Sequence, residues 1–348
     1  MFDIENTSHR RLNILTGEWI LVSPHRTKRP WQGKVENVTP KNVPAYDKDC
    51  YLCPGNERAG GEKNPNYNST FSFTNDFSAL IPTEIEAKIN DENLIIAESD
   101  SGICRVLCFS PRHDLSIAEM DQKSLTAVVD MWIKEYKCLS EDPSINCVTI
   151  FENKGELMGC SNRHPHGQIW AQKLIPNEIR KESIHQRKYS DENQNCLLCG
   201  YLKKERELDS RLIYENDDFV SLVPYWAVWP YETIIIPKFH AENILSLNES
   251  QKLNLAEILK IVTVRYDNLF ETSFPYSMGF HQAPTDNASH PEWHWHIHFY
   301  PPLLRSASVK NLWSVMKCWP WPSGISLPKV LPKSLKIFQK RTIYYANN

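Results

Sequence analysis

The sequence predicts an α+β fold of two similar modules, each a mostly antiparallel sheet with one main helix. Three observations support this prediction. A Cys-x-x-Cys pair occurs at Cys50 and Cys53 and again at Cys196 and Cys199, and related histidine motifs follow each pair in the same order. The apolar stretches are short and rich in β-branched and aromatic residues, which is typical of half-buried strands. One longer segment with helical periodicity separates the motifs in each half, so strands gather around one helix per module.

The first module covers residues 1–176. Its cysteine pair is followed by Ser110-Pro111-Arg112-His113 and then by His164-Pro165-His166. Hydrophobic periodicity predicts strands over residues 105–110 and 148–152 and a helix over residues 121–138. The helix therefore lies between the two motifs in the chain.

The second module covers residues 177–310, with the join near residues 175–195. Its cysteine pair is followed by Ile236-Pro237-Lys238-Phe239-His240 and then by His296-Ile297-His298. Strands are predicted over residues 233–237 and 294–300, and a helix over residues 249–269. A tail of different character, residues 311–348, follows this module.

The length, composition and net charge of the chain restrict the class of function. A chain of 348 residues with 41% hydrophobic content can bury about two ordinary cores. The formal net charge of −3 gives no global positive field, so neither nucleic acid nor a membrane surface is expected as a partner. No signal peptide or membrane-spanning run is evident, which predicts a cytoplasmic protein. In that compartment the ten cysteines are expected to be reduced thiols or metal ligands.

Residues 159–170, with the sequence GCSNRHPHGQIW, carry the clearest chemical signal. On a strand, alternate side chains share a face, so His164, His166 and Gln168 are predicted to point the same way. Polar groups on one face of an apolar strand are costly unless they bind something. A neutral imidazole is a good nucleophile toward phosphorus, which favours His166 as a covalent catalyst. The amide of Gln168 can donate to a phosphoryl oxygen but cannot act as a base toward water, which favours transfer over hydrolysis.

This segment resembles the active-site strand of the galactose-1-phosphate uridylyltransferases, a branch of the histidine-triad superfamily. Further similar segments are residues 10–13, 17–26, 28–33 and 75–77 in the first half and 223–227, 265–270, 273–279 and 299–307 in the second. The resemblance covers residues 9–310. It implies that both modules are histidine-triad-like.

The resemblance also implies an activity. In a ping-pong exchange, UDP-glucose would transfer its uridylyl group to His166 and release glucose 1-phosphate, and galactose 1-phosphate would then accept the group to give UDP-galactose. It further implies a homodimer. The implied substrate-binding residues are Arg26, Arg29, Asn75, Asp76, Asn153, Gly159, Cys160, Ser161 and Gln168. The residue types fit, because arginine offers forked donors to phosphate.

Two metal sites are predicted. Cys50, Cys53, His113 and His164 form a two-thiolate, two-imidazole set suited to structural zinc. The resemblance implies a second site, for Fe or Zn, at Glu182, His281, His296 and His298, with Glu182 on a helix after Pro176. The internal repeat offers an alternative second set of Cys196, Cys199, His240 and His296. His296 cannot easily serve both sets, and the chain departs from better-known relatives in having Cys196, Cys199 and His294.

The tail does not continue the resemblance. It contains three tryptophans and a Trp-Pro-Trp-Pro run. Back-translation with the reading frame shifted by one nucleotide recovers the continuation typical of the family, K-F-M-V-G-Y-E-M-L-A in one-letter code. We interpret the tail as the result of one adenine lost at the codons of Lys310 and Asn311, in the gene or in its sequencing. In the family this stretch contacts the sugar across the dimer, and Met316 and Lys317 have lost that pattern.

Two other functions remain open at this point. A dinucleoside-polyphosphate phosphorylase or hydrolase of the same superfamily would share the strand motif, although the hydrolytic branch typically carries histidine where Gln168 stands. A catalytically impaired, zinc-scaffolded homologue is the other alternative, suggested by the tail. Label transfer from UDP-glucose onto the protein would separate these functions.

Overall fold

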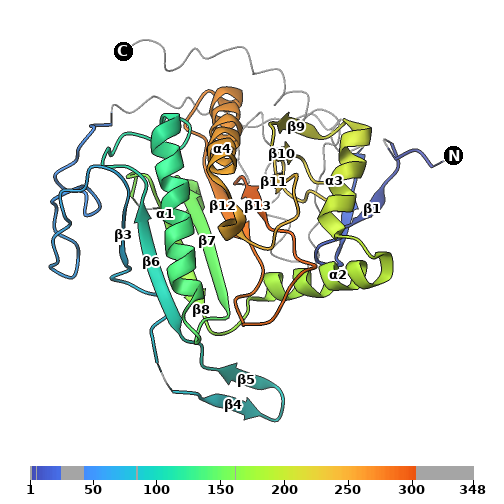
Figure 1. Cartoon of the computed structure of the whole chain (residues 1–348), viewed down its shortest axis with the longest axis horizontal. Coiled ribbons are helices and arrows are strands. Elements are labelled where there is room, and N and C mark those ends of the chain that lie inside the picture. The colour runs from blue at the N-terminus through green and yellow to red at the C-terminus, as the bar shows by residue number, and fades with distance from the viewer. Residues whose placement is uncertain (1, 5, 25–42, 84, 161, 303–348) are drawn as a thin grey trace.

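The fold is built on one nine-stranded sheet (Figure 1). The structure, a computed structural model, describes residues 2–4, 6–24, 43–83, 85–160 and 162–302. Across the sheet the strands are β3 (Phe71–Thr74), β6 (Gly102–Cys108), β8 (His166–Gln172), β7 (Cys147–Lys154), β12 (Tyr276–His281), β13 (His296–Tyr300), β11 (Thr233–Pro237), β10 (Phe219–Leu222) and β9 (Leu212–Glu215). Neighbouring strands pair antiparallel throughout. The predicted α+β, mostly antiparallel fold is confirmed.

The sheet shows the duplication as a mirrored strand order. β7 from the first half and β12 from the second pair at the centre, where Phe151 lies opposite Gly279. Outward from this pair run β8, β6 and β3 on one side and β13, β11 and β10 on the other. β8 therefore corresponds to β13, and β6 corresponds to β11. This correspondence fixes which residues of the two halves are equivalent.

Two long helices, α1 (Gln122–Ser140) and α4 (Glu249–Phe270), pack side by side on one face of the sheet (Figure 1). Both match the predicted helices to within two residues. Asp121 caps α1 by accepting from the Ser124 amide at 2.7 Å, and Asn248 begins α4 with a capping box. Trp132 of α1 packs edge-on to Phe280 of β12, with ring centroids 5.1 Å apart. The main core thus lies between these helices and the sheet.

The second half adds two further helices, α2 (Asn177–Asn193) and α3 (Leu197–Leu208). The helix after Pro176 was predicted, but α3 was not, because its short sequence begins inside the second cysteine pair. Leu198 and Leu202 of α3 pack with Ile234 and Ile236 of β11, so α3 covers the opposite face of the sheet there. The small sheet of β1 (His9–Leu12) and β2 (Trp19–Val22) lies beside the same cluster.

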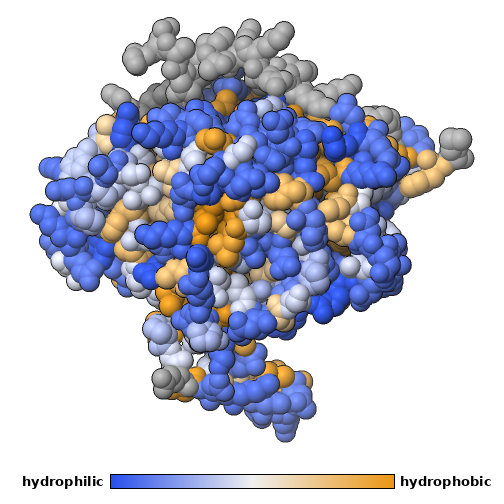
Figure 2. All heavy atoms as spheres, viewed as in Figure 1, coloured by the Kyte–Doolittle hydropathy of each residue, from blue (hydrophilic) through white to orange (hydrophobic). Residues whose placement is uncertain are grey.

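A hairpin of β4 (Lys88–Asp91) and β5 (Ile95–Glu98) projects from the body of the molecule (Figures 1 and 2). Ile89, Leu94 and Ile96 on this hairpin are exposed. Among the residues that the structure describes, no helix is both long and apolar enough to cross a bilayer.

Candidate functional site

Strand β8 separates the core from the site. Ile169 and Ala171 are fully buried in the main core with α1, whereas His166 and Gln168 are half-buried on the other face. This alternation follows from the strand period of two residues. His164 was predicted to share this face, but it lies two residues before β8 begins. Its ring is part of a metal set instead.

A cavity of about 400 Å³ opens over this face of β8. Seven predicted site residues line it: Asn75, Asp76, Asn153, Gly159, Cys160, His166 and Gln168. They come from the end of β3, from β7, from the turn after β7 and from β8. Arg26, Arg29 and Ser161 lie outside the described residues. The cavity therefore gathers every predicted substrate residue that the structure describes.

His166 is held in one tautomer. Its Nδ1 donates to the backbone carbonyl of His164 at 2.7 Å, so the lone pair of the neutral ring is on Nε2. Burial lowers the pKa of His166, which favours this neutral form. A neutral imidazole with a fixed Nδ1–H and a free Nε2 has the electronic state of a nucleophile.

The amide of Gln168 is oriented by its neighbour on the same face. Trp170 Nε1 donates to Gln168 Oε1 at 3.3 Å, which leaves the amide nitrogen of Gln168 to donate to a bound group. An uncharged donor beside a nucleophile can hold a phosphoryl oxygen without offering a base to water.

The cavity also contains an apolar wall whose side chains were given no role in the sequence analysis. Phe73 and Phe77 line the cavity beside Asn75 and Asp76. Arg58 stacks over Phe73 at 4.2 Å and places its Nε 3.2 Å from Asp76 Oδ2. The available signal was the alternation of phenylalanines on both sides of Asn75, at Phe71, Phe73 and Phe77. A planar base could pack against this wall while polar groups read its edges.

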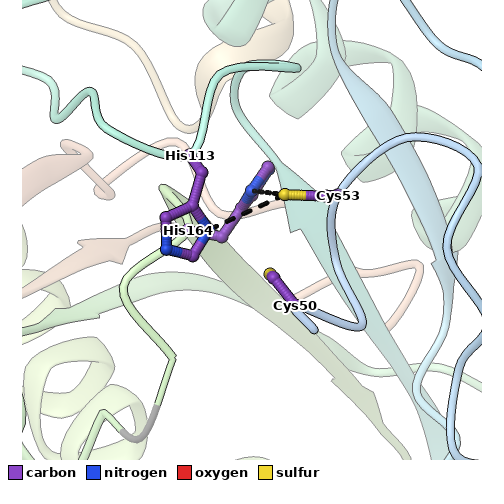
Figure 3. Close-up of side chains that lie close together, drawn as sticks. All are labelled: Cys50, Cys53, His113 and His164. Atoms are coloured by element: carbon purple, nitrogen blue, oxygen red, sulfur yellow. Dashed lines mark hydrogen bonds between the residues drawn. The ribbon is translucent and has the colours of Figure 1, made fainter. Parts of the chain in front are cut away.

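The first predicted metal set is assembled (Figure 3). Cys50 and Cys53 come from the loop before β3, His113 follows β6, and His164 precedes β8. Cys53 Sγ lies 3.7 Å from His113 Nδ1 and 3.5 Å from His164 Nδ1. His164 Nε2 donates to the Ser110 carbonyl at 2.8 Å, so its Nδ1 lone pair faces the sulfur atoms.

The chemistry of this set fits a cation. Burial raises the pKa of the Cys53 thiol to about 12 and lowers the pKa of His164 to about 4. A thiolate at this position therefore needs a neighbouring positive charge, while the imidazole stays neutral, as a ligand must. Four protein ligands leave no open position, which is the pattern of a structural site.

The second predicted metal set is also assembled, around Glu182 of α2. His281 Nδ1 lies 2.8 Å from Glu182 Oε1, and His296 Nε2 lies 3.6 Å from Glu182 Oε2. His298 completes the set. Within the described ranges, Glu182 Oε2, His296 Nε2 and His298 Nδ1 are buried without a hydrogen-bond partner. Such atoms cost about 1–3 kcal/mol each when unpaired, and a bound cation would satisfy them.

The alternative set from the repeat was wrong in one member. Cys196, Cys199 and His240 do come together, but their fourth partner is His294 and not His296. His296 begins β13 just as His166 begins β8, so the residue equivalent to His164 is His294. Because His296 is not shared, this cluster and the Glu182 set both exist.

Comparison with known proteins gives matches over most of the chain. The family model described as "Galactose-1-phosphate uridyl transferase, N-terminal domain" matches residues 1–176, and its C-terminal counterpart matches residues 182–315. Galactose-1-phosphate uridylyltransferases of Saccharomyces cerevisiae and Haemophilus influenzae are 48% and 46% identical to the chain, each covering 89% of it and 88% of the relative.

Solved structures share the fold. A uridylyltransferase structure superposes with a TM-score of 0.72 at 23% identity, covering 95% of this chain and 98% of that one. An ADP-glucose phosphorylase from Arabidopsis thaliana with bound ADP-glucose gives 0.73 at 21% identity, with 96% and 100% covered. The two family models and the relatives above 40% identity show that the chain belongs to the galactose-1-phosphate uridylyltransferase family.

Proposed function

We propose that this protein exchanges a uridylyl group between UDP-glucose and galactose 1-phosphate through a uridylyl-His166 intermediate. The observation that carries the proposal is the geometry of His166, whose Nδ1 is tied to the His164 carbonyl while the ring lines the cavity. Relatives that are 48% and 46% identical to the chain carry the name of this activity.

The reaction has two displacements. In the first, His166 Nε2 attacks the uridine-bound phosphorus of UDP-glucose, a bond from that phosphorus to Nε2 forms, and its bond to the oxygen of glucose 1-phosphate breaks. In the second, a phosphate oxygen of galactose 1-phosphate attacks the same phosphorus, and the bond to Nε2 breaks. The hydrogen bond from Nδ1 to the His164 carbonyl stabilises the positive charge that develops on the ring. Gln168 donates to a phosphoryl oxygen.

The uridine half is proposed to lie along the wall of Phe73 and Phe77. Asn75, Asp76 and Asn153 supply amide and carboxylate groups at the edges of a base or ribose, and Gly159 and Cys160 close the turn beside them. Arg26, Arg29 and Ser161 belong to the proposed site on the strength of the sequence resemblance.

The test is transfer of label from UDP-glucose carrying ³²P in its uridine-bound phosphate. Label should attach to the protein in the absence of acceptor and leave as UDP-galactose when galactose 1-phosphate is added. If label attaches only from a dinucleoside polyphosphate or ADP-glucose, the phosphorylase alternative holds. If no donor labels the protein, the chain is an impaired homologue.

Metal binding is part of the proposal. Cys50, Cys53, His113 and His164 would hold Zn²⁺, whose role in a closed site is structural. Glu182, His281, His296 and His298 would hold a second ion, Fe or Zn, because a carboxylate with three imidazoles suits either. Neither ion takes part in the displacements described above.

Replacing Glu182 with glutamine is expected to remove one metal ion per chain. The change removes the only negatively charged ligand of the set. Changes to residues that merely support a ligand lower metal affinity about 10–100-fold, so replacing a direct ligand should lower it more than about a hundredfold. Elemental analysis after dialysis measures it. Glu178→Gln, on the exposed side of the same helix one turn earlier, is the matched control. An unchanged metal content in Glu182→Gln would contradict the assignment.

A cytoplasmic homodimer completes the proposal. None of the nine cysteines in the described part of the chain forms a disulfide, which supports a reducing compartment. The exposed Ile89, Leu94 and Ile96 of the β4–β5 hairpin offer apolar surface for association of subunits.

Restoring one adenine at the Lys310/Asn311 junction is expected to raise transfer activity. These codons, like the whole tail, lie outside the described residues. The restored sequence would return a tyrosine and a carboxylate able to hydrogen-bond sugar hydroxyls, and loss of two such bonds weakens hexose binding by roughly 1 to 3 kcal/mol, or about tenfold to a hundredfold. Turnover at low UDP-glucose measures the gain, with UMP affinity as the control that should not change. Equal turnover of both forms would show that the tail is a genuine divergence.

A further inference from the structure

We propose that Cys196, Cys199, His240 and His294 bind a third metal ion, of the zinc type, in addition to the two sets above. The cysteines lie at the start of α3, His240 follows β11, and His294 precedes β13. One ligand atom from each residue lies within 4.8 Å of all the others. The proposal goes beyond the transfer reaction and does not depend on it.

The distances fit one tetrahedral ion. His294 Nδ1 lies 3.3 Å from Cys196 Sγ and 3.4 Å from Cys199 Sγ, and His240 Nδ1 lies 4.0 Å from Cys199 Sγ. With zinc bonds of about 2.3 Å to sulfur and about 2.0 Å to nitrogen, neighbouring ligand atoms of a tetrahedron stand roughly 3.5 Å apart. A shift of a few tenths of an ångström would place all four around one ion.

Both rings are already oriented as ligands. His240 Nε2 donates to the Pro291 carbonyl at 2.8 Å, and His294 Nε2 donates to the Pro237 carbonyl at 3.1 Å. Each Nδ1 lone pair therefore faces the sulfur atoms, the arrangement expected of metal-bound histidine. The Cys199 amide also donates to Cys196 Sγ at 3.3 Å, which favours a thiolate.

The site repeats the first metal set in the second module. His164 stands two residues before β8 and His294 two residues before β13. The Nδ1 atoms of His166 and His296 donate to the carbonyls of the preceding set members in the same way, at 2.7 and 3.1 Å. The counterpart of the nucleophile His166 is thus His296, which belongs to the Glu182 set. In the second module the histidine equivalent to His166 therefore belongs to a metal set, and the Cys₂His₂ set is repeated.

The two Cys₂His₂ sets differ in exposure. The four members of the first are buried, whereas Cys196 and Cys199 are partly exposed and His240 is exposed. An ion at the third site therefore exchanges faster, and a chelator should remove it before the ion at Cys50 and Cys53. A disulfide between Cys196 and Cys199 would instead leave both Nδ1 lone pairs without a partner.

The experiment is elemental analysis of the full chain, refolded or expressed with zinc and then desalted. The unaltered protein should hold three ions per chain, and Cys199→Ser should hold two. Cys138→Ser, a change at an exposed free cysteine, is the matched control and should hold three. Should Cys199→Ser fail to fold, His240→Gln, which alters an exposed side chain, takes its place.

Two results would overturn the proposal. One is a metal content that is the same in Cys199→Ser or His240→Gln as in the unaltered protein. The other is an increase of two in the number of titratable thiols per chain when dithiothreitol is added. If Cys199→Ser abolishes this increase, the two cysteines form a disulfide. Neither readout uses uridylyl transfer, so the site is judged separately from the proposed activity.

Discussion

Replacing His166 with alanine is expected to lower the rate of uridylyl transfer roughly a millionfold, as loss of a covalent nucleophile does in other enzymes. The imidazole supplies the attacking Nε2, and the neighbouring polar group on the strand, the Gln168 amide, is not nucleophilic. Single-turnover transfer of ³²P from UDP-glucose to the protein measures the loss. Because His166 is half-buried at a cavity wall, the fold and the metal content should remain.

The control for this change is His9→Ala on β1, outside the cavity and all three metal sets. It should transfer label at the unaltered rate. His166→Gly adds a second test, since free imidazole can enter the space left by the ring and accept the uridylyl group in its place. Label on the His166→Ala protein above background would rule out His166 as the nucleophile.

Replacing Cys53 with serine should remove one metal ion and lower stability and transfer together. Cys53 is fully buried, and a site saturated at about a thousand times its dissociation constant contributes on the order of 4 kcal/mol to folding. The effect is expected to reach the proposed nucleophile, because His164 both belongs to this set and holds His166 through its carbonyl. We expect transfer to fall about 10–100-fold, as it does when outer-shell support is removed.

Elemental analysis, thermal unfolding and label transfer measure these three effects. Cys104→Ser is the matched control, because Cys104 is equally buried but belongs to no metal set in the described part of the chain. This control shows how much stability is lost by burying a serine hydroxyl alone, so the remaining loss in Cys53→Ser can be assigned to the missing ion. If both variants keep the same metal content, Cys53 is not a ligand.

Local patterns made much of the site predictable. His166 and Gln168 could be placed on one strand face because strand periodicity needs no tertiary information. The helices α1 and α4 were predictable because their periodicity and caps lie within the segments themselves. In contrast, Phe73 and Phe77 carry no chemistry of their own, and only the close approach of β3 to β8 through β6 makes them walls of a cavity.

The sequence by itself determined the family, and it predicted His166 as the nucleophile and the residue types of each metal set. The tertiary structure alone decided how the two halves correspond. The internal repeat had matched His164 and His166 to His296 and His298, which is two residues away from the correspondence in the structure. A shift of two residues keeps every side chain on the same strand face, so the alternation of the sequence cannot detect it. The structure can, because β8 and β13 occupy mirrored places in the sheet and begin at His166 and His296 respectively. With this correspondence, His296 belongs to the set of Glu182, and His294 belongs to the set of the second cysteine pair.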